Sequence, residues 1–345
     1  MLRCGAPLRA SHVVVVGPKV GTVVRGRKDR IGAALYSDGM DDIEARELRF
    51  FVAVAEELNF SRAAERLGMT QPPLSRAIRQ LERRLGLPLF ERDTRQVTLT
   101  PAGQAMLNEA GTALEVLSAI VRRTRRAALA TPTLMVTAKP GLATGLLRRI
   151  ADSYTKLPGA VRVDVVVSGY REQASMVRDG RADLALLSSP YDDRGLAAEP
   201  LTSEPRTAAL PSGHDLVRRA ALRCRDLKGW PVPQWPDAIP GERRYWSGQD
   251  RESQSDVPAQ GPVVSDSTQL LEVVGLGQAI ALIPLSLAKS NPRADIVYRL
   301  VGDASPYTTV IAWPEGARAR SVAQFVRTAI GTAREESGTY AEEVS

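Results

Sequence analysis

Residues 61–86 have the sequence SRAAERLGMTQPPLSRAIRQLERRLG, which contains two helical patterns separated by a glycine. The first pattern has an apolar inner face that ends at Leu67, and we expect Ser61 to cap its start. Gly68 follows the last apolar position, where a residue with a left-handed backbone commonly ends a helix. The spacing therefore predicts a short helix followed by a tight turn.

The second pattern repeats apolar residues at spacings of four and three, which predicts a helix with a buried inner face. The members of this face are Leu74, Ile78, Leu81 and Leu85. We expect Thr70 to cap the helix. Pro72 and Pro73 suit its first turn, because their missing N–H groups have no partner inside the helix there. The opposite face begins with small polar residues and becomes rich in arginine. Helix, glycine turn and helix together predict a helix-turn-helix.

Flanking segments complete a small domain. A helix is predicted over Leu48–Leu58, where apolar residues recur at spacings of three and four. Beyond the second helix of the motif, Leu89–Arg92 and Gln96–Thr100 are β-prone. We expect these two segments to form a hairpin, or wing, with Arg92 and Arg95 at its tip.

A long helix is predicted from Pro101 to about Ala130, with a narrow apolar row of the coiled-coil type. The row consists of Met106, Ala110, Ala113, Leu117, Ile120 and Thr124. Such a row more often meets a partner helix, so dimerisation is favoured over packing within one chain. The arginines of Arg122–Arg126 lie near the end of this helix, where positive charge interacts favourably with the helix dipole. This interpretation is favoured over a role of these arginines in contacting DNA.

The pattern changes after residues 131–133, which are interpreted as a hinge. Short apolar strands then alternate with helical segments, which predicts a βαβαβ unit and a second α/β set. The expected strands are 134–138, 161–168, 183–187, 207–210, 262–264, 279–284 and 308–313, and the expected helices are 142–154, 171–179, 268–276 and 322–329. This order predicts two small α/β lobes with a cleft between them. Residues 229–256, which include three tryptophans, receive no assignment.

The net charge of +7 is unevenly distributed along the chain. Residues 61–100 contain eight arginines and four acidic residues, whereas residues 131–345 contain 25 basic and 25 acidic residues. A nucleic-acid site is therefore expected in the first third. Residues 1–42 are interpreted as a basic extension that is disordered or follows from a start codon set too early; a non-specific DNA-binding arm is the alternative. No apolar run approaches the roughly 20 residues of a membrane span.

Patterns typical of enzymes and metal sites are not found in the sequence. The two histidines, His12 and His214, are not spaced as metal ligands, and no nucleophile–base pair accompanies them. The two cysteines, Cys4 and Cys224, are too few for a disulfide scaffold or a four-cysteine zinc site, and they fit a reducing cytoplasm. We expect neither enzymatic activity nor a cofactor.

The segment from Leu48 to Gly103 resembles the DNA-binding domain of LysR-type transcriptional regulators. The resemblance is carried by RF at 49–50, SRAAERL at 61–67, TQPPLSR at 70–76, LE at 81–82, LG at 85–86, LFER at 89–92 and LTPAG at 99–103. It implies a chain of three parts: a largely α-helical winged helix-turn-helix, a long linker helix, and a two-lobed α/β effector domain resembling type-two periplasmic binding proteins. The resemblance extends over roughly residues 43–330.

On this resemblance, the expected domain boundaries are 43–101 for the winged helix-turn-helix and 102–131 for the linker and dimerisation helix. The effector domain is expected over 132–330, followed by a C-terminal tail over 331–345. Lobe I would comprise 132–205 and 303–330, and lobe II would comprise 206–302.

DNA contacts are expected from the first turn of the motif's second helix, which would enter the major groove, and from the wing. Gln71 can pair with adenine, and Arg76 with guanine or a phosphate. The wing arginines would reach the adjacent minor groove or backbone, with Thr70 and Ser75 as phosphate donors. The predicted DNA-binding residues are Ser61, Arg62, Thr70, Gln71, Pro72, Pro73, Ser75, Arg76, Arg79, Arg92, Thr94 and Arg95.

Effector contacts are implied in the loops at strand ends that face the cleft. The predicted effector-binding residues are Lys139, Gly141, Thr144, Tyr170, Ser188, Ser265, Ser267 and Thr268. Residues 139–141 depart from the hydroxyl-rich turn that is usual in the family. A cleft lysine beside hydroxyl groups would suit a small anion such as a carboxylate, and an ordinary surface lysine is the alternative.

The sequence thus predicts a cytoplasmic bacterial transcription factor of the LysR type. We expect it to bind double-stranded promoter DNA as a homodimer or homotetramer, to respond to a small-molecule effector, and to recruit RNA polymerase. An architectural DNA-binding protein without ligand control is the main alternative. A solute-binding protein and an enzyme built on the same lobes are disfavoured by the DNA-binding motif and by the missing nucleophile–base pair.

Overall fold

The computed structural model describes residues 43–93, 96–141, 144–236, 238–239, 241–251 and 259–343. The predicted N-terminal extension and the wing residues Thr94 and Arg95 lie outside these ranges. Within them, every helix is too short or too polar to span a membrane.

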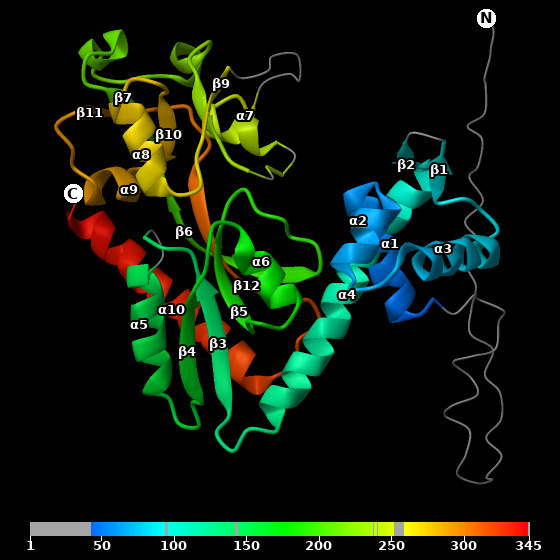
Figure 1. The fold of residues 1–345 in the computed structure, drawn as a ribbon. Coiled ribbons are helices and arrows are strands. Elements are labelled where there is room, and N and C mark those ends of the chain that lie inside the picture. The colour runs from blue at the N-terminus through cyan, green and yellow to red at the C-terminus, as the bar shows by residue number, and fades with distance from the viewer. Residues whose placement is uncertain are drawn as a thin grey trace, which may run out of the picture. The chain divides into compact units, whose positions relative to one another are not determined.

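The first part of the described chain consists of three helices and a hairpin (Figure 1). Its elements are α1 (Ala45–Glu57), α2 (Phe60–Arg66), α3 (Gln71–Leu85), β1 (Phe90–Arg92) and β2 (Val97–Leu99). Strands β1 and β2 pair antiparallel. The predicted helix-turn-helix and the predicted hairpin are both confirmed.

The helix caps differ in part from the prediction. Asn59, not Ser61, caps α2, because its Oδ1 accepts hydrogen bonds from the backbone N–H groups of Ser61 and Arg62 at 2.9 and 3.1 Å. Thr70 occupies the N-cap position of α3, but its side chain makes no capping hydrogen bond. Gly68 has φ +65°, the left-handed conformation predicted after α2.

The predicted long helix is α4 (Pro101–Ala127), and its start is joined to the wing. The Thr100 hydroxyl accepts a hydrogen bond from the Gly103 backbone N–H at 2.9 Å and donates to the Pro88 carbonyl at 2.8 Å. A Cβ atom at Gly103 would lie 2.1 Å from the Leu89 carbonyl oxygen. This position therefore requires a glycine, because a larger residue would push the wing away from the helix.

Beyond α4 the chain forms a five-stranded sheet in the order β4-β3-β5-β12-β6. Strand β3 is parallel to β4 and β5, and β12 is antiparallel to β5 and β6. This arrangement confirms the predicted βαβαβ unit. The strands are β3 (Thr133–Ala138), β4 (Arg162–Val167), β5 (Leu184–Ser188), β6 (Leu196–Glu204) and β12 (Tyr307–Pro314), and the helices packed on them are α5 (Thr144–Thr155), α6 (Glu172–Arg178) and α10 (Arg320–Glu343).

A second, three-stranded antiparallel sheet has the order β10-β7-β11. Its strands are β7 (Arg206–Pro211), β10 (Ala281–Pro284) and β11 (Ile296–Leu300). A parallel pair, β8 (Val232–Gln234) with β9 (Gln260–Val263), lies outside it. The helices of this part are α7 (Glu242–Trp246), α8 (Ser267–Gly275) and α9 (Leu285–Ser290), with short 3₁₀ turns at Asp215–Arg218 and Cys224–Leu227.

Several elements were not predicted, namely β6, β8, β11, α7 and α9. The closing helix is also longer than expected, because α10 continues to Glu343. Residues 331–343, expected as a tail, are therefore helical.

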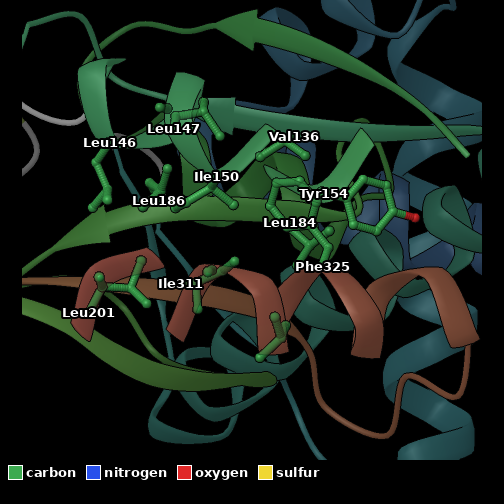
Figure 2. Packing of buried hydrophobic residues seen from close by; sticks show 14 of the residues in the cluster. Val136, Leu146, Leu147, Ile150, Tyr154, Leu184, Leu186, Leu201, Ile311 and Phe325 are labelled. Carbon is green, nitrogen blue, oxygen red and sulfur yellow. The ribbon is translucent and has the colours of Figure 1, made fainter. Parts of the chain in front are cut away.

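Side chains along the strands of the five-stranded sheet alternate between its two faces, and a buried apolar layer lies on each face. Leu184 and Leu186 of β5 pack with Ile150 of α5 and Phe325 of α10 (Figure 2). Ala185 and its partners on the other face pack against α6. Successive side chains of a strand point to opposite faces, so one short apolar strand supports both layers. We call this sheet with its helices lobe I, and the three-stranded sheet with its helices lobe II.

Candidate nucleic-acid interface and ligand cleft

An aromatic core holds α3 in place. Phe90 of the wing packs against Phe51 of α1 and Phe60 of α2, with ring centroids 5.4 and 5.9 Å apart. Leu74 and Ile78 of α3 are fully buried against this core. The predicted inner face is thus confirmed, and the opposite face of α3 is left exposed.

The exposed face of α3 carries polar and cationic side chains at its start. Gln71, Arg76 and Arg79 are exposed, and within the described residues no ion pair engages either of these arginines. Pro72 is exposed and Pro73 is half-buried. The dipole at a helix start favours a nearby phosphate, although Pro72 and Pro73 contribute no backbone N–H group to this turn. Arg76 and Arg79 can face DNA without breaking an ion pair.

Ser75 departs from the prediction. It was expected to donate to a DNA phosphate, which requires an exposed hydroxyl, but only 8% of the residue is accessible. The physical reason is its position three residues before Ile78, which places both side chains over one stripe of the helix.

The wing is fixed to α3 by a carboxylate that the sequence analysis did not single out. Glu82 accepts hydrogen bonds from the backbone N–H groups of Leu89 and Phe90 at 3.0 and 3.2 Å. It also pairs with Arg92 at 3.0 Å, while the Arg92 guanidinium lies 4.6 Å from the Phe60 ring centroid. Arg92 therefore braces the wing in the single chain, and its expected contact with DNA stays a prediction. Two sequence signals pointed to Glu82: it is an acidic residue beside the arginines of the exposed face, and it belongs to the LE pair at 81–82.

Three other predicted residues lie around the start of α2 and α3. Ser61, Arg62 and Thr70 are all exposed. Arg62 pairs with Glu57 at 2.5 Å, and this hydrogen-bonded guanidinium lowers the pKa of the Glu57 carboxyl.

The apolar row of α4 is divided between two environments. Ala110 is buried in the core of the helix-turn-helix, whereas Ile120 is 57% exposed. Val116, Leu117 and Val121 are also exposed next to Ile120. The second half of α4 thus presents an apolar face that nothing in the single chain covers among the described residues.

The arginines at the end of α4 hold lobe I. Arg122, Arg123 and Arg126 donate hydrogen bonds to backbone carbonyls at the end of α6, namely those of Asp179 at 3.0 Å, Val177 at 3.0 Å and Gly180 at 2.5 Å. Carbonyls at a helix C-terminus lack partners within their own helix. Arg125 and Arg126 lie in the last turn of α4, in agreement with the interpretation of the run as charge at the end of its own helix. The run also has partners at the end of a different helix, which the sequence did not indicate.

Two adjoining cavities lie between lobe I and lobe II. The first has a volume of about 280 Å³ and lies against Trp235, Leu270 and Ile283 of lobe II. The second has a volume of about 230 Å³ and extends along the start of α6. Lys139, Tyr170 and Trp246 line both cavities.

Five of the eight predicted effector-binding residues come together at these cavities. Lys139, Tyr170, Ser265 and Ser267 line the first cavity, and Ser188 lines the second. Gly141, Thr144 and Thr268 line neither of the two cavities. The Thr268 backbone N–H instead donates to the Asp266 carboxylate, which caps α8.

Lys139 is set among aromatic rings. Its Nζ lies 5.7 Å from the centroid of Tyr170 and 5.2 Å from that of Tyr307. Burial lowers the pKa of Lys139 from its usual 10.5 to about 8, against the opposing effect of the Glu242 charge. Lys139 is half-buried, whereas the alternative expected an ordinary surface lysine, and its contact with an effector stays a prediction.

Glu242 on α7 is a buried carboxylate that connects the lobes. It is 1% exposed and accepts hydrogen bonds from the Tyr170 hydroxyl, the Trp246 indole N–H and the Ile239 backbone N–H at 3.0, 3.0 and 3.2 Å. It also pairs with Arg171. Tyr170 and Arg171 follow β4 in lobe I, so this carboxylate of lobe II is held by lobe I donors. Burial and the neighbouring carboxylate raise the pKa of Tyr170.

A second buried charged residue holds α7 in place, close to the point where the chain passes from lobe I to lobe II. Arg206 is fully buried and donates to the carbonyls of Ser305 and Tyr245, both at 2.5 Å. Its guanidinium lies 3.8 Å from the Tyr245 ring centroid. Neither Arg206 nor α7 was singled out in the sequence, because their partners are remote along the chain.

The surroundings of Cys224 and His214 indicate that both residues have structural roles. Cys224 is buried, and burial raises the pKa of its thiol to about 12. The His214 side chain accepts a hydrogen bond from the Leu216 backbone N–H at 3.2 Å. Among the described residues, no group of three His, Cys, Asp or Glu side chains is arranged to hold a metal ion.

Known proteins show similarity over most of the chain. Residues 45–104 match the family model of the bacterial regulatory helix-turn-helix protein, lysR family, and residues 127–334 match that of the LysR substrate binding domain. The HTH-type transcriptional regulator AlsR of Bacillus subtilis (strain 168) is 32% identical over 267 residues, which cover 74% of this chain and 85% of AlsR. The Hca operon transcriptional activator HcaR of Escherichia coli (strain K12) is 28% identical over 82% of this chain and 96% of HcaR.

Among solved structures, CbnR, a LysR family transcriptional regulator, superimposes with a TM-score of 0.52 at 24% sequence identity. The match covers 84% of this chain and 99% of the CbnR chain. At this level of sequence identity, the similarity to CbnR supports a shared fold only.

Proposed function

Since the chain belongs to the LysR family, we propose that α3 contacts operator DNA and that the cavities between lobe I and lobe II bind its small-molecule effector. The protein is a DNA-binding transcriptional regulator of the LysR type and not an enzyme. The match of residues 127–334 to the substrate binding domain disfavours the alternative of an architectural protein without ligand control.

One observation carries the assignment of the DNA-contacting surface. At the start of α3, Gln71, Arg76 and Arg79 project from a helix whose other face is locked into an aromatic core. An amide and two guanidinium groups at this position match the hydrogen-bonding edges of adenine and guanine in the major groove. The arginines at the other predicted positions that the structure describes, Arg62 and Arg92, already have acidic partners.

Fluorescence anisotropy tests this surface. The full-length protein is titrated into labelled DNA from the region just upstream of its own gene, with excess random DNA as competitor. We expect specific binding that weakens steeply with salt. Arg76→Ala should cost about 1–3 kcal/mol of specific binding with little effect on binding to random DNA. Arg148→Ala on lobe I, where the side chain is 84% exposed, is the matched control.

Equal losses on both DNAs would make Arg76 a phosphate anchor. Absence of binding to either DNA would refute the proposed surface.

We infer further that the regulator is a dimer built through the exposed apolar face of α4, and that dimers associate into tetramers. Val116, Leu117, Ile120 and Val121 form that face, and their exposure in one chain supports the inference. A dimer would present two α3 helices to a partly palindromic site. Contact with RNA polymerase and a cytoplasmic location belong to the same proposal, because promoter DNA and the polymerase are found there.

A further inference from the structure

The cleft contains a carboxylate of the protein itself. Glu242 lines the second cavity, and its two oxygens receive four hydrogen-bond donors, including Tyr170 and Arg171 of lobe I. Buried carboxylates need such partners, because an unpaired buried charge is costly. Glu242 therefore already fills the anion-binding position that Arg171 and Tyr170 create.

The other charged side chains around the cavities have partners within the protein, and Lys139 differs from them in this respect. Arg178 pairs with Asp192 at 3.2 Å and with Glu115 at 2.8 Å. The Asp266 carboxylate caps α8 through the backbone N–H groups of Thr268 and Gln269. In the described part of the chain, no carboxylate lies within ion-pair distance of the Lys139 ammonium, which instead contacts the rings of Tyr170 and Tyr307.

The wall of the first cavity, beside Lys139, is mostly apolar, and Ser265, Asp266 and Ser267 form a polar part of it. Trp235, Leu270, Ile283 and Leu287 form much of its wall. A ligand with an apolar body and one carboxylate would place the body on this wall and the charge on Lys139. A second carboxylate would meet either the apolar wall, where it loses its hydration, or the negative charges of Glu242 and Asp266.

We propose that Glu242 is a specificity-determining residue that serves as the built-in counter-ion of Arg171 and thereby restricts the cleft to apolar monoanions. This inference rests on the proposed function of the cavities as the effector site. On this proposal, the ligand charge that the cleft accepts is set by one ion pair, that of Arg171 with Glu242. Removing the carboxylate opens a second anion position; removing the guanidinium leaves a negative charge that repels any anion.

The test uses matched probes that differ by one charge: hexanoate against adipate, and benzoate against terephthalate, with hexanamide and benzamide as neutral counterparts. Binding to the full-length protein is measured by isothermal titration calorimetry and by quenching of tryptophan fluorescence, since Trp235 and Trp246 line the first cavity. Wild type should bind each monoanion at least tenfold more tightly than its dianion and its amide.

Three variants separate the charges. Glu242→Gln keeps the shape of the side chain and should reduce the preference for monoanions at least tenfold. Arg171→Gln should weaken monoanion binding at least tenfold. The double variant should restore the wild-type preference, because both members of the pair are then neutral. Glu315→Gln, at an exposed position of lobe I, should change nothing.

An unchanged preference in Glu242→Gln, a wild-type preference for dianions, or no binding of any probe at 10 mM would overturn the inference. If Glu242→Gln does not fold, Arg171→Gln and the double variant still decide the question. DNA binding measured on the same samples keeps the two proposals apart. Specific DNA binding without charge preference refutes only the role of Glu242, whereas loss of DNA binding in wild type refutes the proposed function.

Discussion

The guanidinium of Arg126, near the end of α4, donates a hydrogen bond of 2.6 Å to the carboxylate of Asp183, just before β5. The second oxygen of the same carboxylate accepts a hydrogen bond from the backbone N–H of Met135 on β3 at 2.9 Å. One ion pair thus ties the linker helix to the two central parallel strands of lobe I. Both side chains are mostly buried, so solvent screens this pair less than a surface pair.

Arg126→Ala should lower the free energy of unfolding by about 1–3 kcal/mol, because it removes a charge-assisted hydrogen bond and leaves Asp183 without its cation. The measurement is urea denaturation of the full-length protein, followed by circular dichroism. Arg125→Ala is the matched control: the neighbouring arginine is exposed, and its removal should change stability by less than about 0.5 kcal/mol. Equal effects of the two substitutions would show that the pair contributes no more than general charge.

Gly103→Ala should destabilise the winged helix-turn-helix by about 1–3 kcal/mol, because the new Cβ would lie 2.1 Å from the Leu89 carbonyl oxygen. Gly111→Ala in the same helix meets nothing within 4 Å, so it should stabilise the protein by up to about 1 kcal/mol through higher helix propensity. Thermal unfolding of both variants gives the comparison. The same sign for both would contradict the packing described for Gly103.

Lys139→Met should stabilise the protein at pH 7 by on the order of 1–3 kcal/mol, because it removes a desolvated charge. The pKa of Lys139 is about 8 in the folded chain and near 10.5 when unfolded, so the folded state binds fewer protons between these values. Wild-type stability should therefore rise with pH from about 8 to 10.5 through this group.

Three groups face Lys139. Glu242 is its acidic neighbour. Burial raises the pKa of both Tyr170 and Tyr307 above the usual 10, so these hydroxyls lower the stability once the pH exceeds about 10, and the rise due to Lys139 is measured between about pH 8 and 9. The slope of stability against pH should decrease in Lys139→Met and persist in Lys156→Met, where the lysine is exposed. Denaturation at a series of pH values measures it, and an identical slope in the two variants is the result that contradicts the assignment.

Ile120→Glu should weaken self-association at least tenfold, because it places a charge in the exposed apolar face of α4. Sedimentation velocity measures the oligomeric state, and anisotropy with two-half-site DNA measures the consequence for binding. Leu276→Glu, where the leucine is 69% exposed in lobe II, is the matched apolar-to-acidic control. A wild-type sedimentation profile for Ile120→Glu would place the dimer contact elsewhere.

Local patterns predicted much of the fold. The apolar spacing of Leu74 and Ile78, the left-handed Gly68 and the β-prone segments of the wing each depend on residues a few positions apart, and the structure has all of them. The elements missed, such as α7, lie where prolines and tryptophans interrupt any period. Their positions follow from contacts with other parts of the chain.

The sequence by itself determined the kind of protein: a helix-turn-helix, a linker helix and two α/β lobes, because periodicity and turn residues act locally. Only the tertiary structure decided which side chains meet. Glu242 binds Tyr170 and Arg171 across 72 and 71 positions, and Arg126 binds Asp183 across 57. The physical reason is that a buried charge takes whichever partner the packing brings within about 3 Å, and no spacing in the sequence records that distance.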